Sequence, residues 1–466
     1  MVPFRTQRLS IVGSLFCVAA GGAAHAHPAG GFVDEAQLEI AGTRGGIGDQ
    51  ENLAAEVDGN TAQAAPASSF PLGLAGDWLG LKSRLSRAGV DLTGRYVSET
   101  AWNYAGGRQR EATETGELGI GAAFDMKRLV GLDATIQATM TYRRGLQLDR
   151  EAGLGTLQEV QEIYGNGRGW RLTQFWYEQR LAEGALAVKL GRTSPGEDFA
   201  AFSCDFQNLS FCGSQPGNLV TSYWYNWPVS QWGLRLRGQL GRISVQAAVY
   251  EMNPRNLDEA FTIGYFSGAT GVLLPLEVGF TSGGAHSGPI GSYKIGGWLN
   301  TAPTADVTLD INRRPRILTA LPPLQRSSAH GIWVNLEQQL SGRSERGETI
   351  SGLTVFFNIA LADRLTSPID SQLAAGLMFK GLFQRSGGDA LSAGIARTHV
   401  NSRIARADQL AGKPARGSEY ALELFYGFRP FSWLELRPNL QWIHHAGGGG
   451  ASPDIGVAGL KAQLTL

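Results

Sequence analysis

The feature that most limits how this chain can fold is an alternation of apolar and polar residues that recurs from Val90 onward, in segments of roughly ten residues. In residues 232–240, Leu234 and Leu236 alternate with Arg235 and Arg237, and residues 132–143 and 331–340 follow the same rule. Successive side chains of a strand point to opposite faces. Each segment is therefore predicted to be a strand with one apolar face and one polar, often charged, face.

Alternation alone also fits a soluble sandwich of two sheets, so the number of strands has to decide. About sixteen strands fit into the roughly 375 residues that follow the N-terminal part, too many for one sandwich but natural for a barrel that spans a membrane. Tight connections such as 238–241 alternate with long ones such as 198–221 and 301–328. No run of about 18 apolar residues is present in the sequence, so a membrane would have to be crossed by a closed barrel. We therefore predict an all-β antiparallel transmembrane barrel.

The N-terminal residues predict export. Arg5 and Arg8 precede a mostly apolar run that ends in the small-x-small sequence Ala24-His25-Ala26, so residues 1–26 read as a signal peptide. Residues 27–73 are rich in small residues without periodicity, which predicts a flexible extension. A short helix after Asp77, which can cap it, should lead into the first strand of the barrel, which occupies residues 74–466.

Charge and cysteine content narrow the function further. Removing the signal peptide takes two of the 41 basic residues and no acid, which leaves 39 against 41 acidic residues and argues against nucleic acid as a partner. Only Cys204 and Cys212 remain in the exported chain, and we expect them to form a disulfide that staples a loop.

Residues 161–232 combine aromatic side chains with charged ones. This stretch holds nine Trp and Tyr residues: Tyr164, Trp170, Trp176, Tyr177, Tyr223, Trp224, Tyr225, Trp227 and Trp232. Aromatic faces pack against the C–H face of a sugar, and neighbouring charges hydrogen-bond to its hydroxyl groups. The composition therefore favours handling of a neutral polyol.

Several long stretches match one known family. They include GDWLGLKSRLSRAGVDLTGRYVSETAWN near the N-terminal end, GEDFAAFSCDFQNLSFCGSQPGN and YWYNWPVSQ in the middle, and YALELFYGFRPFSWLELRPNLQWI near the C-terminus. On these runs the chain closely resembles the OprB-type carbohydrate-selective porins of Gram-negative outer membranes. The resemblance covers the sequence from about Leu74 to the end and is loosest around residues 255–330. It implies a sixteen-stranded barrel that lets glucose and related small carbohydrates diffuse inward.

The resemblance also implies a constriction lined by arginine, acidic and tryptophan side chains. Arg143 and Glu99 lie on the polar parity of their strands and match this pattern, as does Trp227. We further expect four residues to line the approach or to brace the wall, with bracing favoured for three of them (Arg95, Glu178 and Arg235) and Trp176 as the fourth.

Two other functions compete with a sugar porin. A porin for quinate-like acids or small anions would need more arginine than acid in its constriction. A barrel enzyme is disfavoured because the sequence has no G-x-S-x-G or H-E-x-x-H motif, and His444 and His445, as neighbours on a strand, point to opposite faces. We expect no cofactor and no metal.

Partners other than the solute follow from the predicted barrel. Outer-membrane lipid should surround it, and the barrel-assembly machinery should insert it, although the terminal Leu466 replaces the usual aromatic residue. Whether the barrel is a monomer or a trimer is left open, because lipid-facing and partner-facing residues are both apolar.

Overall fold

The computed structural model describes residues 73–164, 168–258, 260–283, 288–345, 348–383, 388–450 and 452–466. The predicted signal peptide and nearly all of the predicted extension lie outside these residues.

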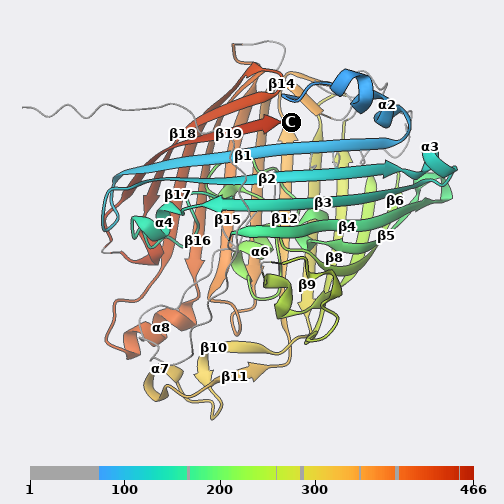
Figure 1. The fold of residues 1–466 in the computed structure, drawn as a ribbon. Helices are drawn as coiled ribbons and strands as arrows, with labels where there is room; N and C mark the ends of the chain where they lie inside the picture. Colours follow the sequence, from blue (N-terminus) through green and yellow to red (C-terminus); the bar gives the residue numbers. More distant parts are fainter. Residues whose placement is uncertain are drawn as a thin grey trace, which may run out of the picture. The chain divides into compact units, whose positions relative to one another are not determined.

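Sixteen strands form a closed antiparallel barrel, as the alternation predicted (Figure 1). The barrel strands are β1 (Val90–Ala105), β2 (Ala112–Asp125), β3 (Ala134–Gly145), β4 (Gly169–Leu181), β5 (Leu186–Thr193), β6 (Gln231–Leu240), β7 (Ile243–Met252), β8 (Gly271–Ser282), β9 (Gly291–Asn300), β12 (Ala329–Gln339), β14 (Glu348–Ala362), β15 (Ile369–Lys380), β16 (Asp389–Val400), β17 (Ser418–Phe431), β18 (Leu434–His444) and β19 (Ile455–Thr465). Each pairs with the next barrel strand along the chain, and β1 pairs with β19, from Arg95 opposite Thr465 to Ala105 opposite Gly456. This last pairing closes the sheet and removes its edges.

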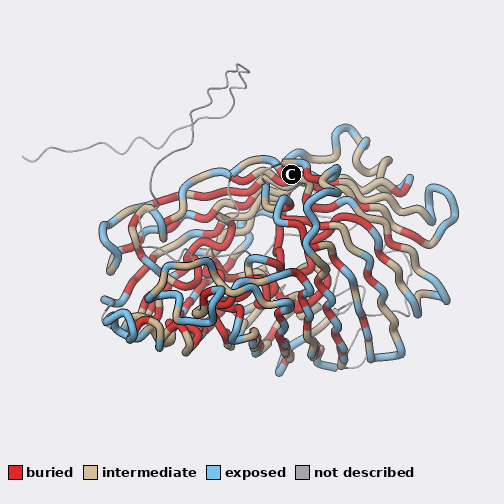
Figure 2. Tube along the Cα trace, turned by 90° about the horizontal axis from the view of Figure 1, so that it is seen from below, coloured by how far each residue is buried: buried red, intermediate tan, exposed pale blue. Residues whose placement is uncertain are grey.

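The apolar face of the strands points outward. Leu276, Ile295 and Leu440 are 53%, 59% and 54% exposed, whereas the inward-facing Glu99 and Arg143 are 0% and 3% exposed. Figure 2 shows how buried and exposed residues alternate along the strands. A soluble protein buries its apolar face, so this inverted arrangement is that of a barrel surrounded by lipid.

The connections differ at the two ends of the barrel. At the end where β1 begins and β19 finishes, the connections are short, and we call this the short-turn end. The other end carries the long loops, including residues 146–168, 194–230, 301–328 and 401–417, and we call it the long-loop end. The elements outside the barrel wall are η1 (Trp78–Gly80), α2 (Leu81–Arg87), α3 (Met126–Val130), α4 (Leu148–Glu151), η2 (Ala182–Gly184), α5 (Pro195–Asp198), η3 (Leu209–Phe211), α6 (Gln215–Leu219), η4 (Pro254–Leu257), η5 (Thr262–Gly264), β10 (Thr304–Asp310), α7 (Arg316–Thr319), β11 (Pro323–Arg326), β13 (Arg343–Glu345), α8 (Ser402–Leu410) and η6 (Ala446–Gly448).

The short helix before the first strand is present as predicted. The backbone N–H of Ser83, in the first turn of α2, donates to Oδ1 of Asp77 at 2.8 Å. Lys82 reaches the carbonyl of the terminal Leu466 at 3.3 Å, so this helix lies beside the seam between β1 and β19. Among the described residues, no helix has the length and apolar content needed to cross a membrane.

Tryptophan side chains on the inner wall lie over glycines of the neighbouring strand. Trp333 on β12 is paired with Gly296 on β9, and Trp298 on β9 is paired with Gly331 on β12. The two indole rings stack with their centroids 6.0 Å apart, and Trp224 packs edge-on against both at 5.5 Å. Each ring occupies the space left by the missing side chain of the glycine opposite. The rings therefore fit only when β9 and β12 pair in this register.

Replacing Gly296 with alanine should therefore destabilise the barrel. The new Cβ would lie 2.1 Å from the Trp333 ring and 2.6 Å from the carbonyl of Leu276, which forces the ring to move. We expect a loss of about 1–3 kcal/mol in the free energy of unfolding, measured by urea titration in lipid vesicles. The matched control is Gly119→Ala, whose Cβ would have its nearest neighbour at 4.0 Å. Equal stability of the two variants would contradict this packing argument.

Candidate functional site

The long loop of residues 194–230 lies inside the barrel. Its helix α6 packs against β12, β14 and β15, whereas Phe206 and Asn208 of the same loop bond to strands β17 and β19. Large side chains such as Trp224 and Phe211 are at most 1% exposed. Because one loop contacts strands on different sides of the barrel, it crosses the interior and occupies part of the lumen.

Carboxylates on the inner wall bind backbone N–H groups of the inward loops. Glu423 on β17 accepts hydrogen bonds from the N–H groups of Gln207 at 2.8 Å and Asn208 at 2.7 Å. Glu277 on β8 accepts one from Ala200 at 2.9 Å. A loop inside a barrel has no strand partner for these donors, and an unpaired buried N–H is costly. The wall acids therefore fix the course of the loop.

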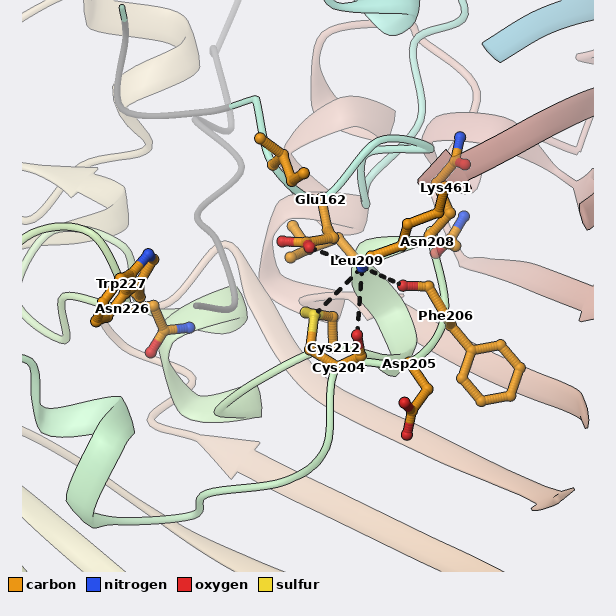
Figure 3. Close-up of a disulfide and its surroundings, with 12 residues drawn as sticks. Glu162, Cys204, Asp205, Phe206, Asn208, Leu209, Cys212, Asn226, Trp227 and Lys461 are labelled. Carbon is orange, nitrogen blue, oxygen red and sulfur yellow. Dashed lines mark hydrogen bonds and ion pairs between the residues drawn. A yellow bond between two sulfur atoms is a disulfide. The ribbon is translucent and has the colours of Figure 1, made fainter. Parts of the chain in front are cut away.

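Lys461 on β19 is the centre of one buried ionic cluster (Figure 3). Its ammonium lies 3.2 Å from Glu99 on β1 and 2.9 Å from Glu162, which belongs to the 146–168 loop. It also donates to the carbonyls of Phe206 at 2.9 Å and Cys204 at 3.2 Å. Lys461 thus joins both inward loops to the seam of the barrel.

Cys204 and Cys212 form a disulfide next to Lys461, which confirms the pairing predicted from the sequence (Figure 3). The two sulfur atoms and a Glu162 carboxylate oxygen lie within 4.8 Å of one another. A disulfide sulfur carries no thiolate to bind a metal, so these residues do not form a metal site.

A second ionic cluster ties the start of the loop to the opposite side. Asp198 pairs with Arg235 on β6 at 2.5 Å and with Lys189 on β5 at 3.0 Å, and it accepts a hydrogen bond from Tyr250 on β7 at 2.8 Å. Burial would raise the pKa of Asp198, but Arg235 and Lys189 outweigh burial and lower it. The carboxylate therefore stays charged, and the ion pairs hold over a wide pH range.

The sequence-predicted residues Glu178 and Trp176 belong to the same cluster. Glu178 forms an ion pair with Arg235, and the Lys189 ammonium lies 4.5 Å from the centre of the Trp176 ring. Arg95, another predicted residue, is half-buried and donates to Gln463 on β19. Each of these contacts joins the side chain to a neighbouring strand or to the 194–230 loop, and the bracing role stays a prediction.

Arg143 and Trp227 meet on a residue that the sequence analysis missed. Glu117 on β2 pairs with Arg143 on β3, and the Trp227 indole N–H donates to the same carboxylate at 2.8 Å. Glu99, predicted to join this group, instead binds Lys461 and the N–H of Ile163. On β1, Glu99 lies two residues nearer the long-loop end than Val97, the residue opposite Glu117. The inward parity of β2 could have identified Glu117, but no local signal links it to a tryptophan 110 residues away.

The comparisons with known proteins agree with this architecture. Residues 109–466 match the family described as carbohydrate-selective porin, OprB family. The chain belongs to this family. It is 38% identical over 433 residues to Porin B of Pseudomonas aeruginosa, covering 88% of this chain and 94% of that protein. It is 32% identical to the putative porin QuiX of Acinetobacter baylyi, covering 84% and 93% respectively.

A solved structure supports the same assignment. The high-pH structure of Pseudomonas putida OprB superposes with a TM-score of 0.80 at 36% identity, covering 86% of this chain and all of that one. This OprB-family protein is therefore an outer-membrane β-barrel porin and not an enzyme. In such barrels the short turns face the periplasm, so the long-loop end is extracellular.

Replacing Lys461 with methionine should weaken the porin strongly. Two buried carboxylates, Glu99 and Glu162, would lose their shared cation, and such a loss costs about 3–5 kcal/mol. We expect a lower urea midpoint and noisier single-channel currents, because the inward loops lose an anchor. Lys380→Met is the matched control, since this lumen lysine is half-buried and has no direct ion pair in the described part of the chain. An equal effect of both substitutions would contradict the anchoring role.

The stability of the 146–168 loop should depend on pH through Asp149. Burial raises the pKa of Asp149 to about 6, although hydrogen bonds from Thr156 and from the Val160 N–H act in the opposite direction. The folded loop therefore prefers the protonated carboxyl, and its stability falls as the pH rises from about 4 through about 6. Hydrogen exchange at Val160 should be faster at pH 7 than at pH 4 after correction for intrinsic rates. Asp149→Asn should remove this difference, and a pH dependence that survives the substitution would refute the assignment.

Proposed function

We propose that this porin lets neutral monosaccharides such as glucose diffuse through a water-filled passage between the barrel wall and the 194–230 loop. The observation that carries the proposal is that ion pairs, such as Asp198 with Arg235, hold the loop across the lumen. Arg143 is matched by Glu117, and Arg235 by Glu178 and Asp198. A passage bordered by such ion pairs attracts neither anions nor cations strongly, which suits a neutral solute.

Arg143, Glu117 and Trp227 set the bore on one side of the passage in this proposal. They are 3%, 2% and 4% exposed, so they act mainly as a rigid border. Glu117 orients both partners through the ion pair and the indole hydrogen bond. An aromatic edge beside guanidinium donors offers a sugar one apolar and one hydrogen-bonding surface.

More exposed groups would meet the sugar along the passage. Asp205 and Arg437 form an ion pair of 3.1 Å, and their side chains are 28% and 12% exposed. Arg95 and Trp176 are half-buried on the inner wall. Burial would raise the pKa of Asp205, but the positive charges of Arg437, Lys380 and Lys461 outweigh it and lower the pKa, so the carboxylate is available as a charged acceptor for sugar hydroxyls.

Arg143→Ala should change the size limit of the pore. Without Arg143, the Glu117 carboxylate has no cation partner and is no longer held in the orientation that accepts the Trp227 indole hydrogen bond. We expect disaccharides to enter liposomes severalfold faster relative to glucose, and reversal potentials in a salt gradient to shift toward cations. Swelling rates with glucose, larger saccharides and quinate measure the size limit, and zero-current voltages across a planar bilayer in a salt gradient measure the ion preference.

Arg237→Ala is the matched control, because Arg237 is a half-buried inward-facing arginine of β6 without an ion pair in the described ranges. It should leave the size limit unchanged. If Arg143→Ala behaves like this control, the assignment of the border is wrong. If the wild-type porin passes quinate faster than glucose, the solute is an acid and the neutral-sugar proposal fails.

A further inference from the structure

The outward faces of β16, β17 and β18 define where the membrane ends on the extracellular side. Ile395, Leu422 and Trp442 lie in one row across these strands and are 54%, 45% and 44% exposed. The next outward row toward the long-loop end holds Arg397, Tyr420 and His444. The change from aliphatic to amphipathic side chains marks the level of the lipid headgroups.

Arg397 presents an open guanidinium at this level. Its side chain is exposed, and its Nε donates to the hydroxyl of Ser418 at 2.9 Å, which fixes its direction. Within the described residues, its two terminal amino groups have neither a carboxylate partner nor a hydrogen bond. An exposed guanidinium at this level is open to an anionic partner from outside the protein.

Arg364 adds a second cation on the same rim. The pairing of β15 with β16 skips from Ile369 to Ser371, and this bulge leaves Asp370 free to contact His399 at 2.6 Å and Arg364 at 3.3 Å. His399 is the next outward residue after Arg397 on β16, so the contacts of Asp370 place Arg364 on the same side of the rim as Arg397. Arg364 is still 60% exposed. Arg397 and Arg364 share this side of the rim with Asp370, and Asp454 pairs with His444 at 2.7 Å.

We propose that Arg397 and Arg364 bind a phosphate group of a lipid in the outer leaflet. The guanidinium matches a phosphate with two parallel hydrogen bonds, and the apolar row below it receives the acyl chains. On the opposite side of the barrel, Arg144 on β3 also points outward, but it already has Glu114 at 3.4 Å and the Tyr96 hydroxyl at 2.7 Å. Arg364 also has a carboxylate partner, Asp370, and donates to the Ser402 hydroxyl, so the lipid site is centred on Arg397, whose terminal amino groups have no partner within the described residues.

The test is native mass spectrometry of the whole porin in detergent, titrated with bisphosphorylated lipid A and with the same lipid after removal of both phosphates. Each arginine should contribute about fivefold in affinity, so Arg364→Gln/Arg397→Gln should bind the phosphorylated lipid about 25-fold more weakly. Arg144→Gln is the matched control and should bind like the wild type. Glucose flux should be the same in all variants, which confirms that the barrel is folded.

Arg397→Lys provides a second measurement, since it keeps the charge and should retain most of the binding. The proposal is overturned if the wild type binds the dephosphorylated lipid equally well. It is also overturned if Arg144→Gln loses as much affinity as the double variant, because the effect would then reflect total charge and not this rim.

Discussion

The arrangement of the barrel interior depends on one constraint: the backbone N–H and C=O groups of a loop inside the barrel need hydrogen-bond partners. Strands satisfy their own N–H and C=O groups through the sheet, but the 194–230 loop has no sheet to join. Glu277, Glu423 and Lys461 supply the missing acceptors and donors from the wall. Because these side chains come from different strands around the barrel, they hold the loop at several points along its course.

The charge distribution follows from the same constraint. A charged side chain enclosed by protein needs an opposite charge, so the anchors occur in groups such as Asp198 with Arg235 and Lys189. Where the 194–230 loop is anchored, positive and negative side chains therefore lie side by side. The ion pairs that hold the loop are thus the same groups to which the proposal assigns selectivity for a neutral solute.

The sequence predicted the barrel well because its signal is local and repeated. Side-chain parity on a strand depends only on neighbouring residues, so alternation assigned Arg143 and Arg235 to the inner face. The side chains that each inward residue contacts could not be predicted from the sequence in the same way. Trp227 and Glu117, or Lys461 and Glu162, are joined only by the path of a loop through three dimensions, and no period in the sequence encodes that path. The disulfide was predictable because the exported chain has only two cysteines.

The seam between the first and last strands carries a consequence for biogenesis. The terminal residue is part of it, since the N–H of Leu466 donates to the carbonyl of Gly94 at 2.8 Å and Lys82 holds the Leu466 carbonyl. Lys461, five residues earlier, joins the same seam to both inward loops. A nascent chain that lacks β19 would therefore expose two unpaired strand edges to lipid, and its inward loops would lack the contacts with Lys461. Closure of the barrel and fixation of the inward loops are thus one event, which requires that β19 has been added.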